Sequence, residues 1–138
     1  MIPARARPRG VRRYNAGMTA DTASRLPDDL AGRLGLARTV LGEDLGVMVC
    51  TVDAAGRPHP AMLSPLEIVA LDPGRLRLVT YPASRTAAHL AADGRVTLMF
   101  VDSDLACYVK GTARPAAPPG PDGARFEVRL DEVTVDRP

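Results

Sequence analysis

The residues best suited to bind an anion stand together in the run Ser84-Arg85-Thr86. A serine at this place can cap the start of a short helix, whose first N–H groups are unpaired and whose dipole is positive at that end. The hydroxyls of Ser84 and Thr86 add two donors, and the planar guanidinium of Arg85 matches the geometry of phosphate oxygens. The run therefore predicts a phosphate site, although the same pattern also occurs at solvated helix starts.

Other residues with reactive side chains show no catalytic spacing. His59 lies beside a turn and His89 lies within the expected helix, and neither has a partner at a spacing typical of a metal site or a catalytic triad. Ser64 lacks the neighbouring glycines of a nucleophile elbow. Cys50 and Cys107 lie in apolar runs without a nearby base, which favours buried free thiols in a reducing cytoplasm. We therefore expect both histidines to be packing or surface residues, and we expect no nucleophile–base pair.

The size and composition indicate a single globular domain. The chain has 138 residues, which suffices for one domain with a substantial core but not for two. Its apolar fraction of 46% and charged fraction of 25% are those of an ordinary globular protein. No apolar run approaches the roughly 18–20 residues of a membrane span. We therefore expect a cytoplasmic protein with no membrane partner.

Positive charge is concentrated at the N-terminus. Residues 1–17 hold five arginines and no acid, whereas the remainder has 13 basic against 16 acidic residues, a net charge of −3. Such an arm can bind nucleic acid or an acidic membrane, but a disordered tail, or sequence upstream of a true start at Met18, is favoured. Beyond the arm, scattered basic residues and few aromatics argue against nucleic acid as a partner. We expect residues 1–26 to be a disordered basic tail and residues 27–138 to form the domain.

Two short helices are predicted. Residues 27–29 (Pro-Asp-Asp) suit the first turn of a helix that ends at Gly42 or Gly46. The second helix is the one that carries the arginine, with Ser84 as its N-cap and Gly94 as its terminator.

The rest of the chain predicts strands joined by tight turns. Strands are expected over residues 45–53, 59–71, 75–81, 95–102, 106–115 and 124–136, with a loop over 116–123. Pro60 and Pro65 place the second of these strands at a sheet edge or at a bulge, and Gly111 indicates a bulge or a close backbone approach. Six short strands without regular βαβ alternation favour a small antiparallel barrel with an aliphatic core.

The order of these elements and three motifs resemble the FMN-binding split barrels related to pyridoxamine 5′-phosphate oxidase. The motifs are G-R-P at residues 56–58, T-x-x-x-S-R-T-x-x-x-L at residues 80–90 and Y-V-K-G-x-A at residues 108–113. The resemblance covers about residues 28–136. It implies a mainly β fold, a six-stranded antiparallel Greek-key split barrel with short flanking helices. It also implies a homodimer that holds FMN at the subunit interface.

The resemblance assigns a cofactor site. The run at residues 84–86 matches the residues that hold the flavin phosphate, and the strand at residues 61–64 matches the one that lies along the flavin ring and ribityl chain. The expected cofactor-binding residues are Ser84, Arg85, Thr86, Ala61, Met62, Leu63, Ser64, Thr80 and Tyr81. The oxidases have lysine in place of Thr86 and another basic residue in place of Pro60, and many relatives have asparagine in place of His89. The phosphate contact here would therefore depend on Arg85, the hydroxyls and the backbone.

The resemblance implies an FMN-dependent oxidoreductase that acts on a small organic molecule. A bound flavin supplies the hydride or electron transfer, so the protein needs no catalytic side chain of its own. Oxidation of vitamin B6 is not implied. Three alternatives stay open: a deazaflavin-dependent reductase of the same fold, a flavin- or haem-binding module that stores or senses its ligand, and a barrel that has lost its cofactor and serves as a dimerising scaffold.

Overall fold

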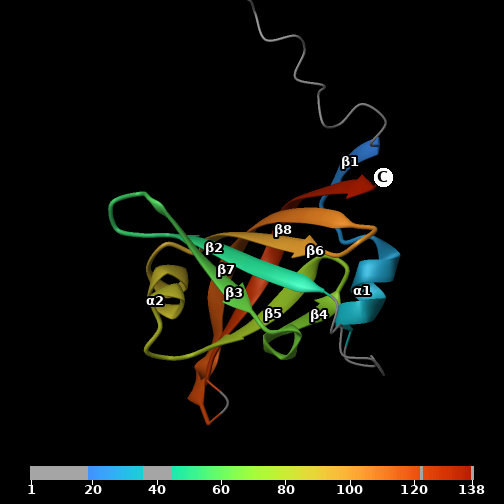
Figure 1. Cartoon of the computed structure of the whole chain (residues 1–138). Helices are drawn as coiled ribbons and strands as arrows, with labels where there is room; N and C mark the ends of the chain where they lie inside the picture. The colour runs from blue at the N-terminus through green and yellow to red at the C-terminus, as the bar shows by residue number, and fades with distance from the viewer. Residues whose placement is uncertain (1–18, 36–44, 122, 138) are drawn as a thin grey trace, which may run out of the picture.

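A computed structural model describes residues 19–35, 45–121 and 123–137, which form one antiparallel sheet flanked by two short helices (Figure 1). The strands are β1 (Thr19–Ala23), β2 (Gly46–Val52), β3 (Pro58–Leu63), β4 (Ile68–Asp72), β5 (Arg75–Thr80), β6 (Arg95–Val101), β7 (Ala106–Gly120) and β8 (Gly123–Arg137). The helices are α1 (Asp28–Leu34) and α2 (Arg85–Ala92), and a 3-10 turn, η1, covers Pro65–Glu67. The predicted mainly β fold is confirmed. Within the described ranges, no helix is long and apolar enough to cross a membrane.

The sheet curls into a split barrel. Its strands follow the order β3-β2-β6-β7-β8-β5-β4, and β1 pairs with the end of β8. Strands β3 and β4 stand at opposite ends of this path, yet only residues 64–67 join them. The two edges of the sheet must therefore come close together, and the barrel is split between them.

Alternation along the strands fills the barrel with aliphatic side chains. On β5, for example, Leu76 and Leu78 are fully buried while Arg75 is exposed. The fully buried core residues of largest volume are Phe100, Leu26, Leu30, Leu34, Ile68, Leu76, Leu78, Leu90, Leu98, Val47, Val49 and Val109. Burying one such side chain contributes about 1.5–3 kcal/mol. Helix α2 is therefore packed against one side of the barrel through the buried side chain of Leu90.

The structure has eight strands where the sequence predicted six. The strand expected over residues 59–71 is divided by η1, whose N-cap is Ser64. The hydroxyl of Ser64 accepts the N–H of Leu66 at 3.2 Å, and the Glu67 carboxylate accepts the N–H of Ser64 at 3.2 Å. Pro60 lies on β3, which is an edge strand as predicted.

The N-terminal boundary also differs from the expected one. Residues 19–26 were expected to belong to a loose tail, but residues 19–23 form β1, and Leu26 is buried in the core. The arginine-rich residues 1–17 lie outside the described residues. Helix α1 starts as predicted but ends at Leu34, with Gly35 as its C-cap, rather than at Gly42 or Gly46.

The prediction of a loop over residues 116–123 is wrong. Strands β7 and β8 stay paired as far as Gly120 and Gly123, and shifts of register after Pro115 and after Ala117 accommodate the proline-rich segment. The bulge predicted at Gly111 is confirmed, because the register shifts between Lys110 and Gly111. A Cβ atom at Gly111 would lie 2.7 Å from the backbone carbonyl oxygen of Arg129, so the backbones approach as closely as the glycine allows.

Candidate functional site

The site begins where β5 leaves the barrel and α2 starts. Ser84 is the N-cap, as predicted: its hydroxyl accepts the N–H of Ala87 at 3.0 Å, and its carbonyl accepts the N–H of Ala88 at 3.2 Å. Gly94 ends the helix with a φ of +84°, which glycine adopts readily. The N–H groups of Arg85 and Thr86 have no partner within the described part of the chain, so they are the donors that α2 leaves open.

Arg85 is the one charged side chain of this helix start, and it is exposed. It forms no ion pair or hydrogen bond with any residue that the structure describes. Arg95, by contrast, holds Asp93 through two hydrogen bonds of 2.8 Å. Arg85 is therefore free to receive an anion. Thr86 is only 7% exposed, so the accessible donors here are Arg85, Ser84 and the backbone.

A pocket of about 320 Å³ adjoins the start of α2. It is lined by Glu67, Val79, Thr80, Tyr81, Pro82, Gly120, Pro121 and Gly123. The Oγ1 atom of Thr80 is fully buried and has no hydrogen-bond partner among the described residues. A buried hydroxyl without a partner is costly, and a turn of the Thr80 side chain toward the pocket would bring this atom to a ligand there. Tyr81 is 83% exposed and covers little of the pocket.

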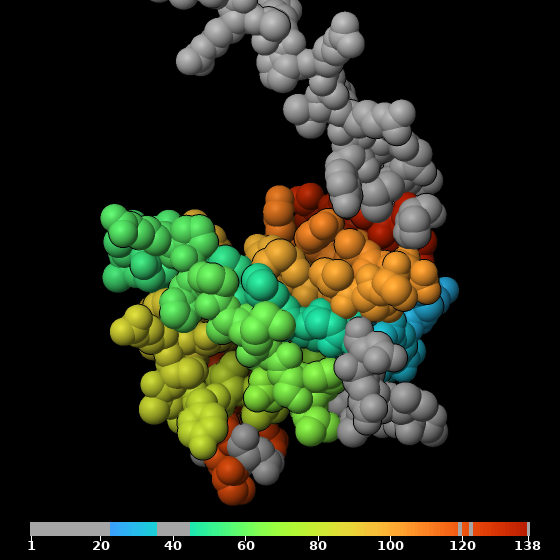
Figure 2. Space-filling view, in the orientation of Figure 1, coloured from blue at the N-terminus to red at the C-terminus, as the bar shows by residue number. Residues whose placement is uncertain are grey.

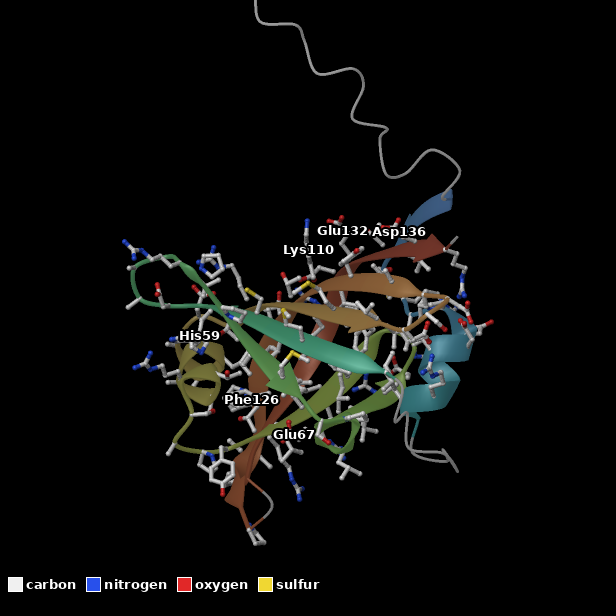
Figure 3. All side chains as sticks on the ribbon, viewed as in Figure 1. His59, Glu67, Lys110, Phe126, Glu132 and Asp136 are labelled. Carbon is white, nitrogen blue, oxygen red and sulfur yellow. The ribbon has the colours of Figure 1, made fainter. Side chains whose placement is uncertain are left out.

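The predicted residues on β3 divide into two groups. Ser64 connects to the pocket through Glu67, whose carboxylate accepts the Ser64 N–H (Figure 3 labels Glu67). Ala61 and Leu63 are half-buried and pack against the core, while Met62 points outward and is 67% exposed. The residues of the pocket lining do not include these three. Of the predicted residues, the pocket lining thus contains Thr80 and Tyr81, whereas Ser64 contacts it only through Glu67, residues 84–86 lie beyond it, and residues 61–63 lie along the neighbouring sheet edge.

Two histidines that the sequence kept apart lie together in the fold. The Nδ1 atom of His89 is 2.9 Å from the hydroxyl of Thr51, and the rings of His59 and His89 meet edge to face with centroids 5.0 Å apart. His59 lies directly opposite Thr51 in the pairing of β2 with β3, and Figure 3 shows it beside α2. The prediction that these are packing or surface histidines is consistent with this geometry. The β2–β3 hairpin was predicted and could have given the pair Thr51–His59; the docking of His89 could not be read from the sequence.

The thiols offer no nucleophile. Both cysteines are free, as predicted; Cys107 is buried and Cys50 is half-buried. Burial raises the pKa of the Cys107 thiol to about 11, so it is neutral at physiological pH. In the described ranges, no three His, Cys, Asp or Glu side chains gather as a metal site would require.

A mostly apolar groove of about 490 Å³ crosses the outer face of β2, β6 and β7. Its lining residues are Cys50, Thr51, Val52, Pro58, Arg95, Val96, Thr97, Met99, Lys110, Gly111, Thr112 and Asp131. Figure 2 shows the surface hollowed between the β2–β3 hairpin and the strands that follow β6. Its volume and mostly apolar lining are typical of clefts that accept a ligand or a partner side chain.

The sequence of the barrel matches a known protein family. The model of the pyridoxamine 5′-phosphate oxidase family matches residues 36–134, which include α2 and strands β2 to β7. No curated protein matches the chain.

Solved structures share the fold at low sequence identity. A candidate pyridoxamine 5′-phosphate oxidase from Lactobacillus delbrueckii is 20% identical, with a TM-score of 0.63 over 80% of this chain and 94% of that one. An FMN-binding protein from Syntrophomonas wolfei is 14% identical, with a TM-score of 0.59 over 78% and 87% of the two chains. HupZ from Group A Streptococcus is 20% identical, with a TM-score of 0.57 over 67% and 86%. These similarities establish a common fold.

Proposed function

Because the chain belongs to the pyridoxamine 5′-phosphate oxidase family, we propose that it binds FMN, with the flavin phosphate at the start of α2. The observation that carries this proposal is the state of Arg85. It is exposed and unpaired among the described residues, and it lies where two backbone N–H groups also lack partners. A helix start with an arginine fork is a good receptor for a phosphate dianion.

The residues present fit the phosphate group. The donors are the Arg85 guanidinium, the N–H groups of Arg85 and Thr86, and the hydroxyl of Ser84, which accepts from Ala87 and can still donate its own proton. Thr80 also lines the adjoining pocket, and its buried hydroxyl has no partner among the described residues. The set contains one formal positive charge, so we expect moderate affinity for the phosphate.

We propose that the protein is an oxidoreductase that acts on a small organic molecule. When bound, the flavin supplies the hydride or electron transfer, and the chain needs to bind, orient and shield it. The state of these side chains supports a reaction carried by the flavin, since the Cys107 thiol is neutral, His89 contacts the Thr51 hydroxyl and the two histidine rings contact each other.

The first test is substitution of Arg85. A charge-assisted contact contributes about 1.5–3 kcal/mol, so Arg85→Ala should weaken FMN binding roughly ten- to a hundredfold in a fluorescence or calorimetric titration. Arg85→Lys should restore only part of the affinity, because an ammonium cannot make the two parallel contacts of a guanidinium. Arg57→Ala is the matched control, since Arg57 is also exposed but stands at the β2–β3 turn.

Two outcomes would count against the phosphate contact. Riboflavin, which lacks the phosphate, would bind as tightly as FMN, or Arg85→Ala would bind FMN normally. The identity of the ligand is checked independently by the absorption spectrum of the purified protein and by the mass of the molecule that heat releases. If heat released a deazaflavin or haem instead, that molecule and not FMN would be the ligand.

We further propose that a second copy of the chain covers the apolar groove on β2, β6 and β7. Met99 lies within the groove, Val101 on the same strand is 49% exposed, and Tyr108, opposite Met99 on β7, is 38% exposed. Light scattering should show a dimer at micromolar concentration, and Met99→Glu should convert it to a monomer. Leu66→Glu is the control, because Leu66 is also an exposed apolar residue but lies on η1, outside the groove lining. A monomeric wild-type protein with bound flavin would rule out this assembly.

A further inference from the structure

Five arginines lie on one outer face of the barrel, although they are scattered in the sequence. They are Arg75 and Arg77 on β5, Arg125 and Arg129 on β8, and Arg114 on β7. The three strands are neighbours in the sheet (Figure 1), and the residues that alternate with these arginines, such as Leu76 and Val128, are buried. Folding therefore converts dispersed basic residues into a single positively charged surface.

Within this surface, Arg75 and Arg129 stand directly opposite each other on β5 and β8. Like charges that face each other across two strands destabilise the pair. Carboxylates at the side hold both guanidiniums: Arg75 Nε donates to Asp72 at 2.8 Å, and Arg129 Nε donates to Asp131 at 3.2 Å. Both Nη atoms of Arg129 and one of Arg75 are left without a partner among the described residues.

A small pocket opens between these side chains. It has a volume of about 210 Å³ and is lined by Arg75, Thr112, Arg114, Glu127 and Arg129. A single oxygen of Glu127 lies 2.9 Å from Arg75 and 3.5 Å from Arg114, so one carboxylate serves two arginines. The charged side chains of the lining, three arginines and one glutamate, give it a net charge of +2.

We propose that this pocket binds the phosphoryl group of a small phosphorylated molecule, between Arg75, Arg114 and Arg129. A phosphate monoester carries a charge of about −1.5 to −2 at pH 7. The five arginines of this surface exceed the three carboxylates beside them, Asp72, Glu127 and Asp131, by two charges, which matches that value. At about 30 Å³ for each water molecule, the pocket has room for roughly seven waters, enough for a phosphoryl group. The guanidiniums are already held by Asp72, Asp131 and Glu127, so binding orders few side chains.

This site is separate from the start of α2. Arg75 and Thr80 stand at opposite ends of β5, five residues apart, which corresponds to about 16 Å along a strand. They also point to opposite faces, because Thr80 is buried and Arg75 is exposed. The inference therefore stands whether or not the protein binds FMN.

The test is a titration with inorganic phosphate, followed by the backbone amide signals of the full-length protein in NMR at constant ionic strength set with chloride. Saturating shifts are expected at residues 112–114 and 127–129, with an affinity in the millimolar range. Arg129→Gln should weaken this binding at least tenfold. Arg95→Gln is the matched control, because Arg95 is equally exposed and is held by one aspartate, but it lies on β6. Arg85→Ala should leave these shifts unchanged.

Three results would overturn the inference. Shifts that grow linearly and spread over all basic residues would show ion screening only. Saturating shifts confined to residues 84–86 would place phosphate at α2 alone. Tighter binding of a single-stranded oligonucleotide than of phosphate, with the same amides shifted, would assign the surface to nucleic acid.

Discussion

Replacing Thr80 by valine should stabilise the ligand-free protein and weaken its binding of flavin. Valine has the shape of threonine and suits a strand, so the change removes the hydroxyl and leaves no cavity. The hydroxyl oxygen of Thr80 is fully buried and unpartnered among the described residues, and the whole side chain is only 7% exposed. The substitution therefore tests whether this atom is kept for a ligand.

The magnitude follows from the cost of burying an unpaired hydroxyl, about 1–3 kcal/mol in mutational series. We expect Thr80→Val to raise the free energy of unfolding by about 1–2 kcal/mol, which for 138 residues corresponds to a rise in Tm of roughly 3–6 °C. If the hydroxyl contacts the bound flavin, the loss of one neutral hydrogen bond should weaken FMN binding roughly two- to tenfold.

The assay is urea unfolding of the flavin-free protein, in which the midpoint should rise while the m-value stays constant. Thr51→Val is the matched control. Thr51 is equally buried, on β2, but its hydroxyl lies 2.9 Å from His89 Nδ1. Its replacement should lower the free energy of unfolding by about 1 kcal/mol, because His89 loses its partner.

A change of the unfolding midpoint in the same direction in Thr80→Val and Thr51→Val would refute the reasoning. If Thr80→Val lowered the midpoint as Thr51→Val does, the Thr80 hydroxyl would have a partner in solution, such as a bound water. Unchanged FMN affinity together with increased stability would show that the hydroxyl is merely unsatisfied and would remove Thr80 from the candidate site.

Two further predictions concern the barrel. The pKa of Cys107 is raised to about 11 in the folded protein from 9.0 in the reference state, so the unfolded chain loses this proton first as the pH rises. The free energy of unfolding should therefore fall by about 2 kcal/mol between pH 8 and 11. Cys107→Ala should remove that part of the pH dependence. Gly111→Ala should lower the free energy of unfolding by about 1–3 kcal/mol in thermal or urea unfolding, because the added Cβ would lie 2.6 Å from Val128. Gly32→Ala in α1, where the new Cβ would meet no described atom within 4 Å outside its own helix, should instead raise the free energy of unfolding by about 0.5–1 kcal/mol; a loss at both positions would contradict the packing argument.

Most strands could be predicted from local signals, and the failures have a common physical cause. Residues 116–120 belong to the proline-rich segment that was predicted as a loop, yet β7 continues through them. The pairing of β6 with β7 ends at Thr112, and beyond the hydrogen bond of Ala113 with Gly94 no strand pairs with that side of β7, so a proline whose nitrogen faces that side removes no ladder hydrogen bond. Similarly, β5 pairs with β8 only as far as Arg129, and the free edge beyond it accepts the polar strand β1. In both cases the partner strand, rather than the local sequence, decides the structure.

The candidate site could be predicted where its determinants are local. The serine cap and the terminal glycine of α2 act within a few residues, and both are found as expected. The unpartnered hydroxyl of Thr80 and the arginine surface could not be found in this way. Whether the Thr80 hydroxyl has a partner depends on which side chains the folded barrel brings near it, and the arginine surface depends on the register of β5, β8 and β7.

The histidine contact gives the start of α2 a support that its sequence does not reveal. Arg85 and His89 are four residues apart, so they lie on the same side of the helix one turn apart. His89 is tied to the barrel through the buried hydroxyl of Thr51, and the carbonyl of Gly94 at the far end of the helix accepts the N–H of Ala113 on β7. These two contacts fix both the rotation of α2 about its axis and its position along the barrel. The direction in which Arg85 leaves the helix is thereby set by residues on β2 and β7, so the phosphate contact that we propose depends on the barrel as much as on the run Ser84-Arg85-Thr86.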